Sequence, residues 1–146
     1  MKYLMILRGC QGSGKSTYAK KLTEKFKSLF KSSAVICSAD DYFMVNGVYN
    51  FNASKLGHAH SDCYDKVTRA MAAEVKLIVL DNTNVKTGDY KNYLKAAETY
   101  GYQVRYKVFD ALDDESIETY IKRNVHNVPA DTIKRMAKTL KESLGE

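Results

Sequence analysis

Apolar residues along this chain form two patterns that alternate from one end of the sequence to the other. The first is the short, nearly continuous run that is typical of strands buried in a parallel sheet. Such runs occupy residues 3–7, 34–37 and 77–80, and a further strand is expected at residues 103–109. These segments together predict one small sheet.

The second pattern places apolar residues three or four positions apart, which is the spacing of one helix face. In residues 15–30 this spacing links Ala19, Leu22, Phe26 and Leu29. Gly101 stands where a helix C-cap belongs, and Pro129 suits the first turn of a last helix. The predicted helices span residues 15–30, 53–73, 85–100 and 113–124, with a last one after Pro129, and residues 40–52 are expected to form a loop.

The alternation of strands and helices predicts an α/β fold, in which helices cover both faces of a parallel sheet. Ligands bind beyond the carboxyl ends of the strands in such folds. Three predicted strands are followed by residues suited to chemistry: residues 9–16, the pair Asp40 and Asp41, and residues 81–83. Because the carboxyl ends of parallel strands lie at one edge of a sheet, we expect these segments to form a single site.

The first of these segments, residues 9–16, matches the phosphate-binding pattern G-x-x-x-x-G-K-[ST], with a strand before it and a helix after it. Its glycines let backbone N–H groups turn toward a phosphate, and the helix start adds its positive dipole end. Lys15 is expected to reach the β- and γ-phosphates, and Ser16 to bind Mg²⁺. We therefore expect ATP or another nucleoside triphosphate to be bound by Gly9, Cys10, Gln11, Gly12, Ser13, Gly14, Lys15, Ser16 and Thr17.

Acidic residues follow the second and third predicted strands. A carboxylate across the cleft from the phosphate loop suits a general base that accepts the proton of an acceptor hydroxyl. The residue pattern does not choose between Asp40 and Asp41, and the pair could instead cap the next segment. Asp81 is expected to face Mg²⁺ as a Walker B aspartate does, or else to cap a turn.

Several neighbouring residues have two interpretations each. Residues 82–84 could bind substrate or form an Asx-type turn. Arg123 could be a lid arginine that reaches the transferring phosphate, or part of a solvated basic helix end. Cys10 lies in a cationic loop that could lower the pKa of its thiol and make it reactive. Aromatic side chains that could stack on bases, or pack as a lid over the core, are Tyr42, Phe43, Tyr49 and Phe51.

Composition narrows the class of protein. The 146 residues fit one domain, over residues 1–146, and no apolar run approaches the ~20 residues of a membrane span. Three cysteines without a CxxC pair argue against a disulfide framework and suit a reducing compartment, so we expect a soluble cytoplasmic protein. The net charge of +6 suits a polyanionic partner such as nucleic acid, or is merely a soluble basic surface.

These motifs together resemble the kinase domain of bacteriophage-type polynucleotide 5′-hydroxyl kinases. The resemblance covers nearly the whole chain and is most specific at residues 9–17, 40–42, 81–84 and 100–129. It implies a P-loop kinase fold with a four-stranded parallel sheet and a short C-terminal lid. It also implies the roles of individual residues: Asp40 as the general base, Lys15 and Ser16 at the phosphates and Mg²⁺, Asp81 among the active-site carboxylates, and Arg123 in the ATP-side lid.

The chain departs from this family at two positions. Phe43 occupies the place of an arginine that helps to hold the acceptor strand in the family. The lid is shorter, and only His126 stands near the place of a second lid arginine. We also expect the phosphatase half of bifunctional relatives to be absent. These departures bear on the acceptor more than on the chemistry.

Three functions are compatible with the sequence. The first is ATP-dependent phosphorylation of the 5′-hydroxyl end of DNA or RNA, which the net charge and the aromatic loop favour. The second is a small-molecule kinase that acts on a nucleoside, sugar or antibiotic hydroxyl, which Phe43 favours. The third is a nucleotide-binding switch or adaptor, which would not need Asp40 as a base for an acceptor.

Overall fold

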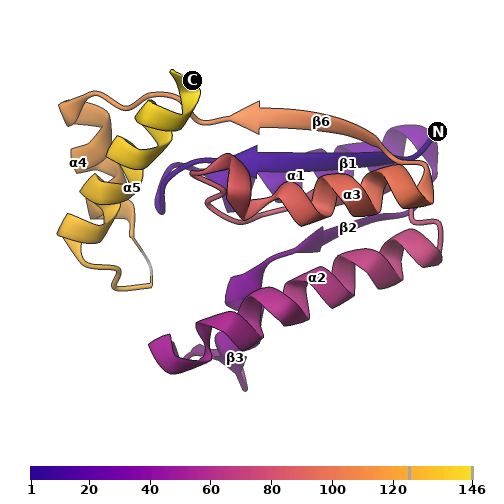
Figure 1. The fold of residues 1–146 in the computed structure, drawn as a ribbon, viewed down its shortest axis with the longest axis horizontal. Helices are drawn as coiled ribbons and strands as arrows, with labels where there is room; N and C mark the ends of the chain where they lie inside the picture. Colours follow the sequence, from indigo (N-terminus) through magenta and orange to yellow (C-terminus); the bar gives the residue numbers. More distant parts are fainter. Residues whose placement is uncertain (125, 146) are drawn as a thin grey trace.

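The computed structural model describes residues 1–124 and 126–145, which form an α/β fold around one parallel sheet (Figure 1). The sheet has the strand order β2-β5-β1-β6, with β1 and β5 in its centre. In the register, Leu4 of β1 pairs with Ile78 of β5 and with Val104 of β6. The strands are β1 (Tyr3–Arg8), β2 (Ala34–Cys37), β5 (Leu77–Leu80) and β6 (Gln103–Val108). The predicted fold class and four-stranded parallel sheet are confirmed.

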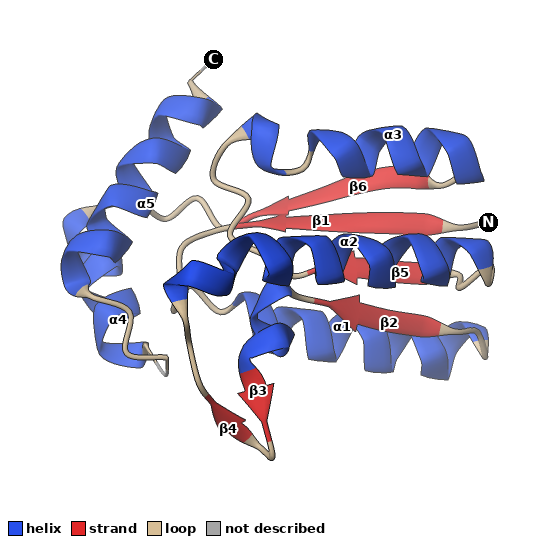
Figure 2. Ribbon diagram, turned by 60° about the horizontal axis from the view of Figure 1, so that its bottom comes forward, coloured by secondary structure: helices blue, strands red, loops and turns tan. Residues whose placement is uncertain are grey.

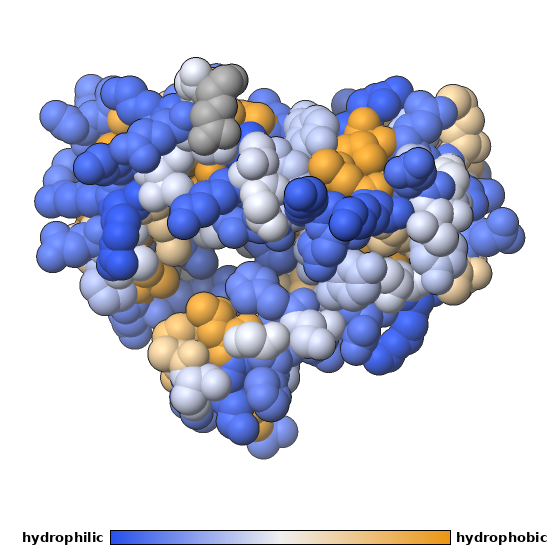
Figure 3. Space-filling view, in the orientation of Figure 1, coloured by the Kyte–Doolittle hydropathy of each residue, from blue (hydrophilic) through white to orange (hydrophobic). Residues whose placement is uncertain are grey.

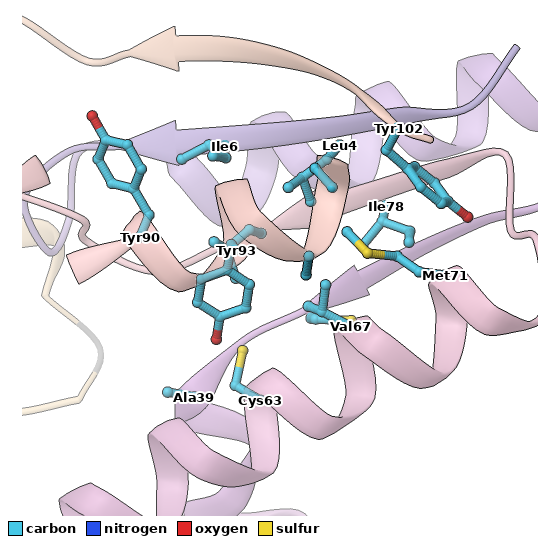
Figure 4. Close-up of a cluster of buried hydrophobic side chains, with 14 of the residues drawn as sticks. Leu4, Ile6, Ala39, Cys63, Val67, Met71, Ile78, Tyr90, Tyr93 and Tyr102 are labelled. Atoms are coloured by element: carbon cyan, nitrogen blue, oxygen red, sulfur yellow. The ribbon is translucent and has the colours of Figure 1, made fainter. Parts of the chain in front are cut away.

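Helices cover both faces of the sheet, as the alternating pattern predicts (Figure 2). On one face α1 (Lys15–Phe30) packs its buried Ala19 against Leu7 and Val79. On the other face lie α2 (Leu56–Ala72) and α3 (Lys91–Tyr100). Figure 4 shows the larger core cluster on that face, where Leu4 and Ile78 of the strands meet Val67, Met71 and Tyr93 of the helices.

The last two helices, α4 (Asp114–Arg123) and α5 (Ala130–Leu144), pack against each other beyond the carboxyl ends of the strands (Figure 1). Asp113 caps α4 by accepting a hydrogen bond from the Ser116 N–H, as its position at the helix start predicts. Tyr120 of α4 and Ile133 of α5 enclose Cys10 in a separate apolar cluster. This cluster fixes the helix pair to the phosphate loop.

The segment predicted as a loop, residues 40–52, contains regular structure. It begins with a short 3₁₀ helix, η1 (Ala39–Phe43), followed by an antiparallel hairpin of β3 (Met44–Val45) and β4 (Val48–Tyr49). Asn46 and Gly47 form its turn, with φ values of 51° and 80°. The Asn-Gly dipeptide is a strong signal for such a two-residue hairpin turn, and the loop prediction overlooked it.

Two helix starts also differ from the sequence-based bounds. Residues 53–55 form a 3₁₀ turn, η2 (Ala53–Lys55), before α2 begins. Residues 85–100 are not one helix, because a separate 3₁₀ turn, η3 (Thr87–Asp89), precedes α3. The buried Asn84 has a φ of 47°, which holds the chain out of helical geometry just before this turn.

Among residues 1–124 and 126–145, the helices lack the combination of length and hydropathy that a membrane crossing requires.

Candidate functional site

The loop between β1 and α1 has the geometry of an anion-binding turn. Gly12 and Gly14 adopt positive φ values of 80° and 100°, and the Ser13 N–H donates a hydrogen bond to the Cys10 carbonyl at 3.2 Å. Within the described part of the chain, no side chain caps the N-terminus of α1, which begins at Lys15. The first N–H groups of a helix have no partners within the helix, so they are available to phosphate oxygens.

Gly12 is also the point at which α4 touches this loop. A Cβ atom at Gly12 would overlap the backbone carbonyl of Tyr120. We expect Gly12→Ala to lower the free energy of unfolding by about 1–3 kcal/mol, because it combines left-handed strain with a backbone clash. Gly47→Ala is the matched control, because Gly47 has the same φ of 80° but open space around it. Thermal unfolding should show a clearly larger loss for Gly12→Ala, and equal losses would contradict this close approach.

Lys15 and Asp81 are opposite charges buried at the base of the cleft. Lys15 is 7% exposed, and its Nζ donates a hydrogen bond to the Cys10 carbonyl at 2.9 Å. Burial lowers the pKa of Lys15, and the nearby Asp81 charge opposes this shift. Asp81 is 9% exposed, and burial raises its pKa against the opposing effect of Lys15. A bound phosphate would replace the Cys10 carbonyl as the partner of Lys15.

Ser16 and Asp81, the two predicted Mg²⁺ ligands, lie side by side. The Ser16 hydroxyl donates a hydrogen bond to Asp81 Oδ2 at 2.9 Å. This contact joins the start of α1 to the end of β5. A hydroxyl and a carboxylate oxygen in contact are a donor set that suits a hard cation such as Mg²⁺.

Asp40 is held at the end of β2 by two neighbouring side chains. Ser38 Oγ accepts a hydrogen bond from the Asp40 N–H at 3.2 Å, and Asn82 Oδ1 accepts one from the Ala39 N–H at 2.8 Å. The Asp40 carboxylate faces the phosphate-binding loop across a shared cavity, whereas Asp41 is exposed and outside the cavity lining. The geometry thus separates the two candidates that the sequence left open and favours Asp40.

One cavity of about 230 Å³ brings together the three strand ends and the C-terminal end of α4. Figure 3 shows an opening between the α4–α5 pair and the lobe that carries β3. Arg123, at the end of α4, borders this cavity rather than facing only solvent. The lining residues are Gln11, Gly12, Gly14, Lys15, Ser16, Thr17, Ser38, Asp40, Asp81, Asn82, Thr83, Arg123 and His126.

Two of the polar residues after β5 support the fold. Asn84 is buried and donates a hydrogen bond to the Leu7 carbonyl at 2.8 Å, which fixes β1 to the turn after β5. Arg8, which the sequence analysis did not single out, donates to the Asn84 carbonyl at 2.9 Å and to Ser143 Oγ at 2.9 Å. Asn82 holds Ala39, as described above. The third residue of this segment, Thr83, lines the cavity. Within the described part of the chain, its side chain makes no hydrogen bond to η1.

The aromatic residues of the loop divide between two roles. Phe43 is 3% exposed and belongs to the main core cluster, so it cannot contact an acceptor. Tyr42 and Phe51 are exposed, and Tyr49 lies against the imidazole of His126. Tyr49 and His126 were missed as a pair, because they are distant in sequence and no local pattern connects them.

The reactive-thiol interpretation of Cys10 is wrong. Cys10 is 0% exposed, and its burial raises the pKa of its thiol despite the nearby Lys15 charge. Such a thiol is protonated near neutral pH and inaccessible to oxidants. Cys10 instead fills the apolar contact between the phosphate loop and the C-terminal helices.

Comparison with known sequences gives matches over most of the chain. The sequence model of the family described as "AAA domain" matches residues 4–143. NEDD4-binding protein 2 of Homo sapiens is 35% identical over 133 residues, which are 91% of this chain and 7% of that protein. The 2′,3′-cyclic-nucleotide 3′-phosphodiesterase of Pongo abelii is 32% identical over 108 residues, which are 70% of this chain and 23% of that protein. The chain therefore spans less than a quarter of the length of these relatives.

Solved structures share the fold over nearly the whole chain. A chain in the Pnkp1/Rnl/Hen1 RNA repair complex matches with a TM-score of 0.77 at 20% identity, covering 99% of this chain and 45% of that chain. The Mycobacterium tuberculosis APS kinase CysC in complex with AMPPNP and APS matches with a TM-score of 0.61 at 12% identity, covering 99% and 98%. At these identities the likeness shows the fold, which is that of P-loop kinases.

Proposed function

Because the chain belongs to the AAA domain family and has a P-loop kinase fold, we propose that it transfers the γ-phosphoryl group of ATP to a hydroxyl acceptor. We propose further that this acceptor is the 5′-hydroxyl end of DNA or RNA. The observation that supports the transfer most is the convergence of Lys15, Asp40, Asp81 and Arg123 on one cavity.

In this proposal, the loop at residues 9–16 and Arg123 at the end of α4 bind the phosphates. The backbone N–H groups at the start of α1 hold the phosphates, and Lys15 places its charge on the β- and γ-phosphates. Ser16 and Asp81 fit Mg²⁺, which neutralises charge on the same phosphates when bound. Arg123, at the end of α4, borders the same cavity and is proposed to contact the transferring phosphoryl group. These positive charges act where negative charge spreads in the transition state.

Asp40 is proposed to be the general base. The acceptor hydroxyl oxygen forms a bond to the γ-phosphorus while the bond from that phosphorus to the β–γ bridging oxygen breaks. The hydroxyl proton passes to the Asp40 carboxylate, and ADP leaves with the bridging oxygen. Asp40 suits this role because it borders the same cavity as Lys15 and Ser16 but belongs to a different strand end.

A second groove supports a polymeric acceptor. It shares Asn82 and Thr83 with the first cavity and continues between α2 and α3, with a volume of about 510 Å³. Lys91 and Lys95 of α3 line it, together with His60 of α2. If the 5′ end of a nucleic acid strand lies at Asp40, the phosphates that follow this end could contact Lys91 and Lys95 in the groove. One matched relative is named for a cyclic nucleotide, and one matched structure belongs to an RNA repair complex.

The groove leads to a prediction about salt. If Lys91 and Lys95 each neutralise one phosphate, Lys91→Gln combined with Lys95→Gln should weaken oligonucleotide binding at low salt. The slope of log affinity against log salt should fall by ~0.7 for each phosphate of a single strand that no longer faces a lysine. Lys134→Gln combined with Lys138→Gln is the charge-matched control, since these lysines are exposed on α5 beside a different pocket. Equal slopes for the two double variants would exclude this groove as the path of the strand.

A small-molecule acceptor is the second candidate, and the buried Phe43 favours it. The side chain at the position of the family's acceptor-holding arginine is part of the core here. A transfer screen with radiolabelled ATP should include 5′-hydroxyl oligonucleotides as well as nucleosides, sugars and aminoglycosides. Preferential labelling of oligonucleotides supports the proposed acceptor, and labelling of small hydroxyl compounds alone would replace it.

A further inference from the structure

The rings of His126 and Tyr49 stack on each other, so that they connect the segment between α4 and α5 to the β3–β4 hairpin. The imidazole of His126, in the connection between α4 and α5, lies on the ring of Tyr49 in β4, with centroids 3.9 Å apart and planes at 5°. Figure 2 shows the β3–β4 hairpin and the α4–α5 connection at the same end of the sheet.

Both rings also turn a polar atom toward the Asp40 carboxylate. The Tyr49 hydroxyl donates a hydrogen bond to Oδ1 at 3.3 Å, and His126 Nδ1 lies 3.6 Å from Oδ2. Each carboxylate oxygen therefore has its own neighbour, one from the hairpin and one from the lid. A carboxylate offers about four acceptor positions, so an acceptor hydroxyl can still approach it.

The two contacts to Asp40 differ: the Tyr49 contact is a hydrogen bond, whereas the His126 contact is too long to be one. Tyr49 is a permanent donor near neutral pH, because burial and the Asp40 charge raise its pKa to about 12. His126 Nδ1 is buried and has no hydrogen-bond partner among residues 1–124 and 126–145. A separation of 3.6 Å is longer than a hydrogen bond, and catalytic hydrogen bonds commonly tighten only in the substrate complex. Shortening the separation between His126 Nδ1 and Asp40 Oδ2 from 3.6 Å to hydrogen-bond distance would complete the contact.

We propose that His126 is a positioning residue that, together with Tyr49, fixes the Asp40 carboxylate for the acceptor hydroxyl. His126 lines the same cavity as Arg123 and Asp40, so its Nδ1 faces the carboxylate within the proposed site. This inference rests on the proposed transfer to a hydroxyl, and it gives His126 a role in aligning the base.

Two substitutions at His126 separate its nitrogen from its ring. His126→Phe keeps a ring that can stack on Tyr49 but removes Nδ1, and His126→Asn places an amide nitrogen near the position of Nδ1 without the ring. We expect His126→Phe to lower kcat roughly tenfold, in line with the loss of one hydrogen bond to a charged group, while KM for ATP changes little. His126→Asn should recover part of this loss. His58→Phe is the matched control and should keep the wild-type kcat, because His58 is exposed at the start of α2.

The same substitution in an Asp40→Asn background tests whether His126 acts through Asp40. Residues that act as one unit are strongly non-additive, so His126→Phe should cause no further loss in Asp40→Asn. A wild-type kcat for His126→Phe, or an equal loss in both backgrounds, would overturn the inference while leaving the proposed function intact. A wild-type protein that transfers phosphate to no hydroxyl would overturn the proposed function and this inference with it.

Discussion

Lys15→Ala should lower phosphoryl transfer by roughly a hundredfold or more, which is the usual effect of losing one preorganised charge donor. The effect is large because Lys15 is nearly buried, where water screens its charge little. Its Nζ already lies in the phosphate loop, 2.9 Å from the Cys10 carbonyl, so little reorganisation is needed when phosphate binds. Initial rates of transfer from radiolabelled ATP measure the loss.

Lys20→Ala is the control for this substitution, because Lys20 is exposed on the same helix. It should keep the wild-type rate. Circular dichroism and thermal unfolding establish that Lys15→Ala is folded at the assay temperature. Near-normal transfer by a folded Lys15→Ala protein would contradict the assignment of residues 9–16 as the phosphate-binding loop.

Asp40→Asn should lower kcat by roughly 10²–10⁴, the typical range for general acid–base help. The amide keeps the size of the side chain and can still contact Tyr49, but it cannot take up the hydroxyl proton. ATP binding should be nearly unchanged, since the role proposed for the Asp40 carboxylate is to accept the hydroxyl proton and not to hold the phosphates. Steady-state kinetics and direct ATP binding by calorimetry separate the two effects.

Asp41→Asn is the matched control, since Asp41 is the adjacent carboxylate and lies outside the cavity lining. It should reduce kcat much less than Asp40→Asn. An inactive Asp41→Asn enzyme beside an active Asp40→Asn enzyme would reverse the assignment of the base. Full activity of both variants would show that neither carboxylate is the base of the transfer.

Local pattern was sufficient to predict the sheet and most of the helices. Buried parallel strands need apolar side chains on both faces, so 77–80 stands out as a continuous apolar run and is wholly buried in the structure. The end of each apolar run marks the end of a strand. On this basis, Asp81 and Asp40 were correctly predicted to lie at the carboxyl edge of the sheet. The hairpin was missed because its strands are only two residues each and carry no periodicity, and because the Asn46-Gly47 signal was overlooked.

The site was predicted where chemistry follows a strand and missed where it depends on tertiary contacts. Ser16 and Asp81 could be paired in advance, since parallel strands end at one edge, and their side chains are in contact. The approach of His126 to Asp40 depends instead on how α4 and α5 pack beside the loop, through Cys10 and the close fit at Gly12. No periodicity in the sequence predicts the contact between His126 and Asp40, because this contact depends on how side chains from separate elements pack.

Transfer of phosphate to a 5′-hydroxyl end can be measured by the appearance of label on an oligonucleotide. The wild-type protein is incubated with γ-labelled ATP, Mg²⁺ and either of two oligonucleotides that differ only in a 5′-hydroxyl or a 5′-phosphate. The proposal predicts label at the 5′ end of the hydroxyl oligonucleotide, removable by a phosphatase, and none on its phosphorylated counterpart. Failure to label the 5′-hydroxyl oligonucleotide, by a protein that binds ATP and the oligonucleotide, would contradict it.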